Sequence, residues 1–367
     1  MLDLWITVNS PGEVSGWLRP VLAEIEKRKL PWRIIVALPP CRYASGHEED
    51  VCRNLPGVAE VVNTKKFLKL VFWGQWPDSL LPQAQSLVLF LGGDLMYALG
   101  LKWRLGVKAV AYTDGRRQWV SRFEHFVTRL DIGDLRADGV DATPVSDYDF
   151  QRLRLDPHKK RLLFLPGSRP AHVSKVLPFF MHTMRLLEAE CPDWEFVINF
   201  APFVNEAYHL AQLKQVYVNA VILQEDSQLV LKCADFICCL PGTNTSEAAF
   251  LGVPMLVVLP TNWPDIIQLD GLAGLLGNIP ILGVAFKWLL VAILARTLKF
   301  TALPNQWAKK TIVPELIGTL RPQQLAEQLK LYLQGAEWRQ KIKTQLQQQS
   351  FVKPGAARRL VDILETL

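Results

Sequence analysis

Short runs of β-branched and apolar residues alternate along the chain with segments whose apolar positions recur at helical spacing. Runs of four to seven residues fit strands better than helices. Because strands that alternate with helices form parallel sheets covered on both faces, the pattern predicts an α/β protein. Nine strands are expected, over Leu4–Val8, Trp32–Leu38, Ser86–Leu91, Val107–Tyr112, Arg161–Leu165, Trp194–Phe200, Ala220–Leu223, Phe236–Leu240 and Met255–Leu259.

A polar stretch that contains a proline, Asp156–Lys160, separates the first four predicted strands from the other five. The length of 367 residues also fits two domains. We therefore expect a first domain over 1–156, a second over 157–335, and C-terminal helices over 336–367 that pack back on the first. Doubly wound domains bind ligands at the carboxyl ends of their strands, so a cleft between the two is the expected place for a site.

Composition excludes a disordered chain, since half of the residues are hydrophobic and only 21% are charged. Twelve Trp together with a net charge of +6 favour contact with an anionic membrane surface. No nucleic-acid partner is expected. Met1–Val8 has no basic n-region and no small-residue cleavage site after an apolar stretch, so no secretory signal is expected. Six irregularly spaced cysteines indicate reduced thiols in a cytosolic protein, and burial is favoured over metal binding at Cys233, Cys238 and Cys239.

Two segments are candidates for membrane contact. Gly271–Ala295 is almost wholly apolar, but Pro280, several glycines and Lys287 interrupt it, so a buried helix and an interfacial patch are equally favoured over a membrane span. In Lys65–Trp76, lysines neighbour an aromatic cluster. Such a mixture suits the headgroup layer of a bilayer, and an ordinary amphipathic core helix fits the same pattern equally well.

Two turns of the first domain carry candidate chemistry. Asn9–Trp17 follows the first strand; Gly12, Ser15 and Gly16 free backbone N–H groups there, and Glu13 adds a carboxylate. Plain turn chemistry explains this segment equally well. Asp94 follows the strand that ends near Leu91, directly after two glycines, and is a candidate general base. Its alternative role is that of a helix N-cap.

The second domain has three such segments. A strand runs into Gly167, Ser168 and Arg169, and the fork of arginine donors suits a diphosphate, although a surface arginine is the alternative. A later turn and helix start could cradle a phosphate or simply cap the helix; it consists of Gly242, Thr243, Asn244, Thr245, Ser246 and Glu247. Asn305 fits either a turn or a sugar ligand.

Five short motifs, in one order along most of the chain, resemble those of the lipid-A-disaccharide synthases. They are Gly12–Gly16 (GEVSG), Leu165–Arg169 (LPGSR), Gly242–Ala248 (GTNTSEA), Leu303–Asn305 (LPN) and Val313–Leu316 (VPEL). Asp94 falls where that family has a carboxylate proposed as catalytic base. The chain departs from the family at Trp17, His172 and Pro241. On the acceptor side, the family's aromatic loop is only faintly matched at Tyr112–Trp119, so the nucleotide side resembles the family more closely.

The resemblance implies the GT-B fold, in which two doubly wound Rossmann-like domains face each other. It also implies transfer of an acylated glucosamine from a UDP carrier to a sugar hydroxyl on a lipid acceptor, without metal or cofactor, by a cytoplasmic enzyme on the inner face of the membrane. Asp94 would then take the acceptor proton, with Glu13 and Arg169 as further catalytic groups. Ser15, Gly16, Gly167, Ser168, Asn305 and the Gly242–Ser246 turn would bind the UDP-sugar, and Glu247 would hold its ribose.

Three other functions stay open at this stage. A transferase acting on another lipid or glycan acceptor would keep the same nucleotide side. A nucleotide-sugar epimerase shares the fold but needs additional acid and base groups around the sugar. A catalytically silent envelope protein would keep the fold alone. A homodimer is also left open.

Overall fold

The computed structural model describes residues 2–41, 43–77, 79–80, 85–140, 143–205, 219–225, 227–263, 299–349 and 354–367. The chain forms two compact units: Met1–Gly139 with Val352–Leu367 is unit 1, and Val140–Phe351 is unit 2. The predicted apolar segment Gly271–Ala295 lies outside the described residues.

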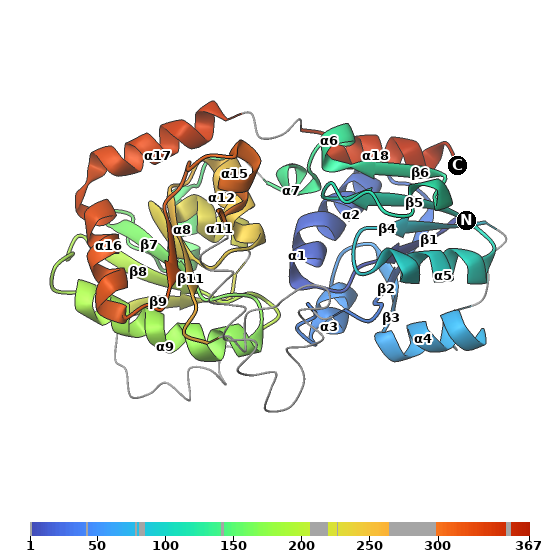
Figure 1. Ribbon diagram of the computed structural model, residues 1–367, viewed down its shortest axis with the longest axis horizontal. Coiled ribbons are helices and arrows are strands. Elements are labelled where there is room, and N and C mark those ends of the chain that lie inside the picture. The colour runs from blue at the N-terminus through green and yellow to red at the C-terminus, as the bar shows by residue number, and fades with distance from the viewer. Residues whose placement is uncertain are drawn as a thin grey trace. The chain divides into compact units, whose positions relative to one another are not determined.

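Within the described part of unit 1, six parallel strands form one sheet in the order β3-β2-β1-β4-β5-β6 (Figure 1). The strands are β1 (Leu2–Thr7), β2 (Trp32–Ala37), β3 (Val58–Val62), β4 (Ser86–Phe90), β5 (Lys108–Thr113) and β6 (His125–Thr128). The helices are α1 (Pro11–Glu13), the π-helix η1 (Val14–Leu18), α2 (Arg19–Lys27), α3 (Glu48–Arg53), α4 (Thr64–Trp73), α5 (Leu95–Leu105), the 3-10 helix η2 (Val120–Arg122), α6 (Arg129–Ile132), α7 (Leu135–Asp138) and α18 (Ala356–Glu365).

Unit 2 repeats this arrangement, and its described residues form a parallel sheet in the order β12-β11-β10-β7-β8-β9. The strands are β7 (Lys160–Leu165), β8 (Trp194–Asn199), β9 (Ala220–Leu223), β10 (Phe236–Cys239), β11 (Met255–Pro260) and β12 (Glu315–Gly318). The helices are α8 (Asp147–Leu153), α9 (Pro170–Leu187), α11 (Ser227–Cys233), α12 (Thr243–Leu251), α15 (Leu303–Ala308), α16 (Pro322–Gln334) and α17 (Ala336–Gln348).

All nine predicted strands are confirmed, with ends that agree to within two residues. The pattern missed β3, β6 and β12, and each of these lies at the edge of its sheet. An edge strand has only one neighbour and is only partly covered, so its sequence need not be apolar throughout. In β3, for example, an exposed Ala59 and a half-buried Glu60 interrupt the apolar run.

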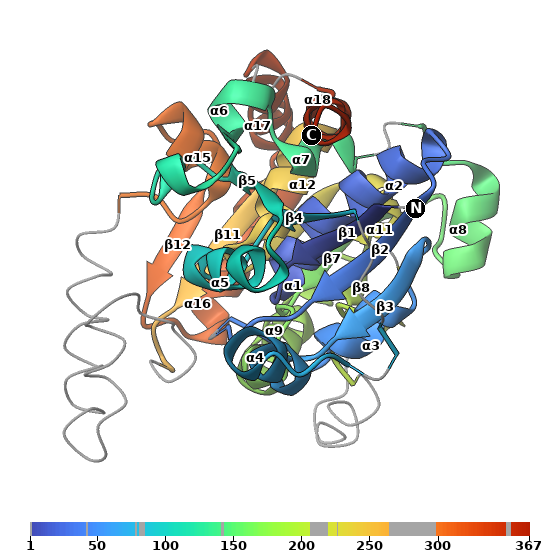
Figure 2. The ribbon, with the colours of Figure 1, turned by 90° about the vertical axis from the view of Figure 1, so that its right-hand side faces the viewer.

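The units divide at Gly139, before the expected boundary at Asp156. The reason is packing: Leu153 and Leu155 are buried in the core of unit 2. The C-terminal helices also separate. Helix α17 buries Ile342 and Leu346 in the core of unit 2, whereas α18 packs on α2 in unit 1 (Figure 2).

Polar contacts fasten α18 to unit 1. Arg28 on α2 forms ion pairs with Asp362 at 2.8 Å and Glu365 at 2.5 Å. At the other end of α18, the carboxylate of Asp138 accepts the backbone N–H groups of Gly355 and Ala357, both at 2.6 Å. An acceptor at a helix N-terminus satisfies donors that have no partner within the helix, so this contact fixes where α18 begins.

Candidate active site

Both sheets place their first and fourth strands side by side, since β1 pairs with β4 in unit 1 and β7 pairs with β10 in unit 2. The connections leave these two strands toward opposite edges of the sheet. Ligands of open α/β sheets bind at such a switch point, outside the carboxyl ends of the strands. The segments that follow these four strands carry Glu13 in the first helical turn and Asp94, Arg169 and Gly242 as helix N-caps, so most predicted site residues lie at the two switch points.

The first of these turns is shorter than the sequence pattern predicts. Helix α1 begins at Pro11, with Ser10 as its N-cap, and continues through the π-helix η1 into α2. A proline at the first helical position preceded by serine is a strong helix start. The expected loop through Trp17 is therefore wrong, and Ser15 and Gly16 lie within η1, where Gly16 is buried.

Glu13 connects this helix start to the turn after β4. One carboxylate oxygen, Oε2, accepts the backbone N–H of Asn9 at 2.8 Å, and the other, Oε1, accepts that of Gly93 at 3.0 Å. Hydrogen bonds to a carboxylate are about twice as strong as neutral ones. Burial raises the pKa of the Glu13 carboxyl above its ordinary value, an effect that the hydrogen bonds from Asn9 and Gly93 oppose and the nearby Glu48 reinforces.

Two glycines leave room for this contact. A Cβ atom on Gly92 would lie 2.1 Å from the carboxyl carbon of Glu13, so any side chain at this position would displace the Glu13 carboxylate from its two hydrogen bonds. Gly93 has a φ of +85°, and a Cβ atom on it would lie 2.9 Å from Cγ of Pro39. The side chain of Asn9 donates to the carbonyl of the same Pro39. The turn that precedes Asp94 is thus enclosed by groups from the ends of β1 and β2.

We predict that Gly92→Ala lowers the free energy of unfolding by about 3 kcal/mol, near the upper end for overpacking. The cause is the clash with Glu13, since the backbone of Gly92 has no positive φ. Denaturant unfolding would measure it, and the same substitution in a Glu13→Ala background should cost much less. An equal cost in both backgrounds would mean that the clash lies elsewhere.

Asp94 is the N-cap of α5, and its Oδ1 accepts the N–H of Met96 at 2.9 Å. The side chain is exposed. No hydrogen bond among the described residues is recorded for Oδ2. The N-cap role is thus confirmed, and it occupies one of the two carboxylate oxygens.

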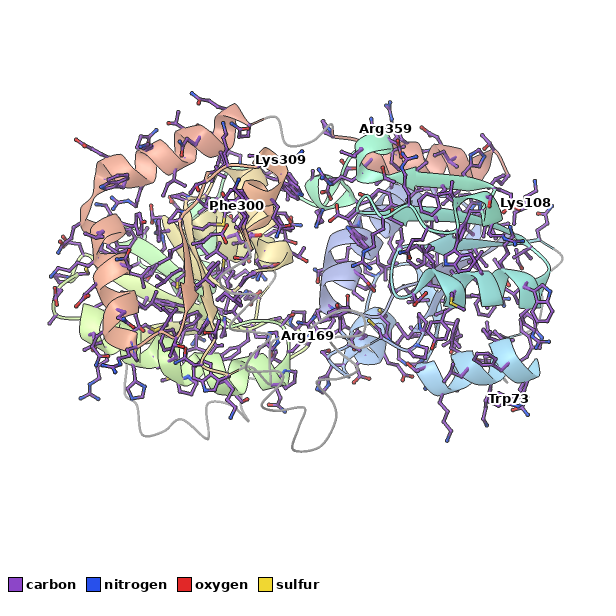
Figure 3. All side chains as sticks on the ribbon, viewed as in Figure 1. Trp73, Lys108, Arg169, Phe300, Lys309 and Arg359 are labelled. Carbon is purple, nitrogen blue, oxygen red and sulfur yellow. The ribbon has the colours of Figure 1, made fainter. Side chains whose placement is uncertain are left out.

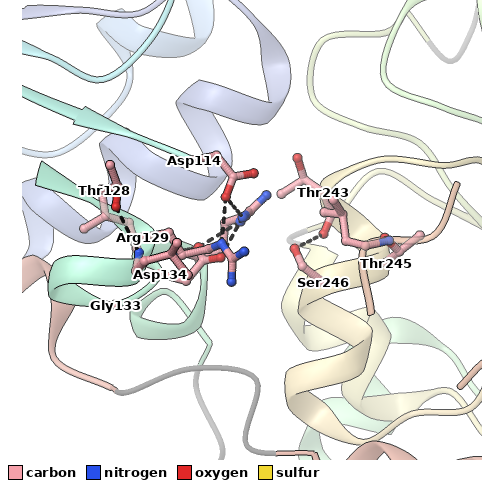
Figure 4. A network of polar contacts seen from close by, with 12 residues as sticks. Asp114, Thr128, Arg129, Gly133, Asp134, Thr243, Thr245 and Ser246 are labelled. Atoms are coloured by element: carbon pink, nitrogen blue, oxygen red, sulfur yellow. Dashed lines mark hydrogen bonds and ion pairs between the residues drawn. The ribbon is translucent and has the colours of Figure 1, made fainter. Parts of the chain in front are cut away.

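A cluster that the sequence gave no sign of lies beyond β5. Asp114 accepts from Arg129 at 2.9 Å and from Arg136 at 3.0 Å, and Arg136 also pairs with the buried Asp134 at 2.6 Å (Figure 4). The guanidinium of Arg136 lies 5.9 Å from the ring centre of Trp17. These residues come from four separate segments. Because its charges are mutually paired, the cluster stiffens the carboxyl ends of β5 and β6.

In unit 2, the turn after β7 holds Gly167 in the left-handed region, with a φ of +110°. A Cβ atom there would lie 3.1 Å from Cβ of His172 and 3.2 Å from Cδ1 of Leu240. The turns after β7 and β10 therefore touch. Arg169, labelled in Figure 3, follows as the N-cap of the 18-residue helix α9. Its side chain makes no capping hydrogen bond.

The predicted ligands in the turn after β10 fall into two groups that differ in burial. Gly242 is exposed, with a φ of +156°, and Thr243 and Asn244 are half-buried at the N-terminus of α12. Thr245 and Ser246 are fully buried and donate their hydroxyls to the carbonyls of Gly242 and Thr243, at 2.7 and 2.6 Å (Figure 4). The first group can present backbone N–H donors to an anion, whereas the second shapes the helix start.

Glu247 is buried next to Ser227 of α11, whose hydroxyl lies 3.4 Å from its Oε2.

Asn305 is wholly engaged within the protein. Its Oδ1 accepts the N–H groups of Ile312 and Val313 at 2.7 and 2.9 Å. Its Nδ2 donates to the carbonyl of Val313 at 2.8 Å and to Glu315 at 2.6 Å. An asparagine side chain offers two donors and two acceptor lone pairs, so all four are used. No donor or acceptor of Asn305 is therefore left for a sugar in this structure. Its side chain instead holds the loop before β12.

The six cysteines are free thiols. Cys238 and Cys239 lie in the buried strand β10, and burial raises the pKa of Cys239 to about 12. Such a thiol stays protonated and unreactive at neutral pH.

The family described as lipid-A-disaccharide synthetase matches residues 137–265, a range that contains both switch-point turns of unit 2. The lipid-A-disaccharide synthase of Psychromonas ingrahamii is 31% identical over 193 residues, which are 50% of this chain and 43% of that protein. That of Syntrophus aciditrophicus is 25% identical over 338 residues, 87% of this chain and 82% of that protein. The chain is a divergent relative of the lipid-A-disaccharide synthases. The aligned part spans less than half of the Psychromonas protein and most of the Syntrophus one.

Several solved structures have the same fold as this chain. The UDP-GlcNAc 2-epimerase from Neisseria meningitidis, bound to UDP-GlcNAc, superposes with a TM-score of 0.58 at 13% identity over the full length of both chains. The spinosyn rhamnosyltransferase SpnG, complexed with thymidine diphosphate, gives 0.54 at 15% identity, again over both full lengths. The predicted GT-B fold of two doubly wound units is thereby confirmed.

Proposed function

We propose that this protein is a glycosyltransferase that moves an acylated glucosamine-type sugar from a UDP carrier to a sugar hydroxyl on a lipid-linked acceptor. The observation that carries the proposal is the family match over 137–265, because it contains the Gly167–Arg169 and Gly242–Asn244 turns. Both turns open helices at the switch point of unit 2, with backbone N–H groups suited to phosphate. Arg169 adds a guanidinium for the negative charge of the departing UDP.

The acceptor chemistry belongs to unit 1 in this proposal. Asp94 removes the proton of the acceptor hydroxyl as that oxygen attacks the anomeric carbon, and the bond from the sugar to UDP breaks. Its exposed carboxylate at the end of β4 supports this role. In unit 2, Glu247 holds the ribose of UDP in the same scheme.

The function is tested by the products formed from a panel of UDP-sugars and extracted lipids, identified by mass spectrometry. The proposal predicts that UDP is released only when a lipid acceptor is present. Conversion of a UDP-sugar without an acceptor would identify an epimerase instead. Absence of nucleotide binding by calorimetry would point to a catalytically silent protein.

We further propose that unit 1 rests on the inner, anionic face of a membrane through α4 and α5. Phe72 and Trp73 at the end of α4 are 59% and 69% exposed, and Trp103 of α5 is 78% exposed (Figure 3). Lys65, Lys66 and Lys69 are exposed on α4 as well. Exposed aromatic rings beside lysines suit the boundary between lipid headgroups and acyl chains. Among the described residues, no helix has the length and apolarity needed to cross a bilayer.

Two aromatic residues of the Lys65–Trp76 segment do not belong to this proposed surface. Phe67 is fully buried, and Trp76 packs against the buried Trp5, with ring centres 6.0 Å apart. Both therefore serve the core and not the surface. Arg104 of α5 donates to the carbonyls of Val71 and Phe72 at 3.0 and 3.2 Å, which fixes the end of α4 against α5.

Sedimentation with vesicles that contain phosphatidylglycerol tests this surface. We predict that the double substitution Trp73→Ser and Trp103→Ser weakens vesicle binding by at least roughly 10-fold, because two large apolar side chains no longer enter the lipid. Trp338→Ser is the matched control, since this tryptophan of α17 in unit 2 is 54% exposed. Equal binding of the double variant and the wild type would exclude this surface.

A further inference from the structure

The carboxylate of Glu13 reaches the segment that carries Asp94, although the two lie far apart in the sequence. Oε1 of Glu13 accepts the backbone N–H of Gly93 at 3.0 Å, and Gly93 immediately precedes Asp94. Oε2 accepts the N–H of Asn9 at 2.8 Å. Each oxygen thus has a backbone partner, and one bridging carboxylate joins the end of β1 to the end of β4.

The surroundings of this bridge leave the turn little freedom. On one side the Glu13 carboxyl occupies the space where a Cβ atom of residue 92 would stand. On the other side Pro39 lies 2.9 Å from the position of a Cβ atom on Gly93. The N–H groups of Leu91 and Gly92 both donate to the carbonyl of Thr7, at 3.1 and 2.8 Å. The backbone just before Asp94 is therefore held from three directions.

The side chain of Asp94 itself makes a single hydrogen bond among the described residues, the 2.9 Å bond from the N–H of Met96 to its Oδ1. The direction of the carboxylate thus depends on where the backbone of residues 93 and 94 lies. A displacement of a reacting group by about 1 Å can cost about 100-fold in rate. A residue that fixes this backbone therefore changes the reaction rate without touching the substrate.

We propose that Glu13 is a positioning residue that acts on the reaction through Asp94. Its bridge to Asn9 and Gly93 holds the Asp94 carboxylate where it removes the acceptor proton. The inference rests on the proposed function, in which Asp94 is the base. It differs from the sequence-based expectation that Glu13 is itself catalytic, because proton transfer by Glu13 would compete with one of its two backbone hydrogen bonds.

The substitution Glu13→Gln tests the bridge. Glutamine has nearly the same size, but it presents one oxygen and one NH₂ group to two N–H donors, so one hydrogen bond is lost. We expect kcat for acceptor-dependent UDP release to fall by roughly 10- to 100-fold, with an unchanged KM for the UDP-sugar. Glu24→Gln on α2 is the control, since it neutralises a carboxylate that bonds Arg28, away from this turn. We expect this control to keep the wild-type kcat.

A double substitution separates positioning from direct catalysis. If Glu13 acts through Asp94, Glu13→Gln adds little to the loss already caused by Asp94→Asn. If the losses in kcat caused by the two single substitutions multiply in the double variant, Glu13 acts independently of Asp94, and the proposal is overturned. A lower melting temperature with an unchanged kcat for the folded enzyme would also overturn it, because the bridge would then serve stability alone. If the wild-type enzyme releases no UDP with any acceptor, the proposed function fails, and this outcome is distinct from both.

A measurement on the wild-type protein covers the case in which Glu13→Gln does not fold. The amide proton resonances of Asn9 and Gly93 are expected to shift together as Glu13 titrates, with a midpoint above the ordinary glutamate pKa, since burial and Glu48 both raise it. Asn9, Gly93, Ser10 and Glu48 are the groups that act on this carboxyl. If the two amide proton resonances shift with different midpoints, one carboxylate does not bond both groups, and the bridge is overturned.

Discussion

Replacing Asp94 with asparagine is expected to lower the rate of acceptor-dependent UDP release by about 10²- to 10⁴-fold, the contribution typical of general acid–base catalysis. Asparagine cannot take up the acceptor proton. It is nevertheless as good an N-cap as aspartate, and its oxygen can still accept the N–H of Met96. We therefore expect the free energy of unfolding to change by less than about 0.5 kcal/mol. Steady-state kinetics at saturating donor, together with denaturant unfolding, measure both quantities.

Asp94→Ala is the companion variant, because it removes the cap and the base together. It should lose about 1 kcal/mol of stability, the usual cost of a missing N-cap. Its rate should match that of the asparagine variant. Wild-type turnover by Asp94→Asn would leave Asp94 with the role of a helix cap only.

Removing the guanidinium of Arg169 is expected to lower the same rate by about 10²- to 10³-fold, as seen when one donor to a developing negative charge is lost. The side chain of Arg169 makes no capping hydrogen bond to α9, so Arg169→Ala should leave the start of that helix intact. UDP binding should weaken in parallel, and calorimetry with UDP measures this without any acceptor.

Two further variants make the Arg169 experiment specific. Arg185→Ala removes an exposed arginine from the last turn of the same helix and should change neither the rate nor UDP affinity. Arg169→Lys keeps the charge but not the planar fork, so it should recover only part of the rate. If Arg169→Ala binds UDP with unchanged affinity, Arg169 does not bind the diphosphate.

Much of the fold follows from the pattern of apolar residues alone. Strands in the middle of a parallel sheet are buried on both faces, so β1, β4, β7 and β10 each contain an apolar run that a sequence reveals directly. The switch points lie after these same strands. The sequence therefore located the turns of Asp94, Arg169 and Gly242. In a parallel sheet all strands end at the same edge, so a motif directly after a central strand must lie at that edge.

Local sequence did not reveal which polar side chains in those turns are accessible. Thr245 and Ser246 look like phosphate ligands in the sequence, yet both are buried and bond to the carbonyls of their own helix. Asn305 looks like a turn residue or a ligand, yet all of its hydrogen-bonding capacity is used by Ile312 and Val313 in the loop before β12 and by Glu315 at the start of β12. Side-chain chemistry is the same in either role, and only the neighbours differ.

The sequence by itself thus determined the α/β class, the central strands and the position of the candidate site, since hydrophobic burial and strand-end turns are local signals. The tertiary structure alone decided the joining of Glu13 to Gly93, the boundary at Gly139 and the separation of α17, which packs in unit 2, from α18, which packs in unit 1. Each of these depends on contacts between residues that lie far apart along the chain. Such contacts leave no periodic trace in the sequence, because either partner alone could satisfy its chemistry in many other ways.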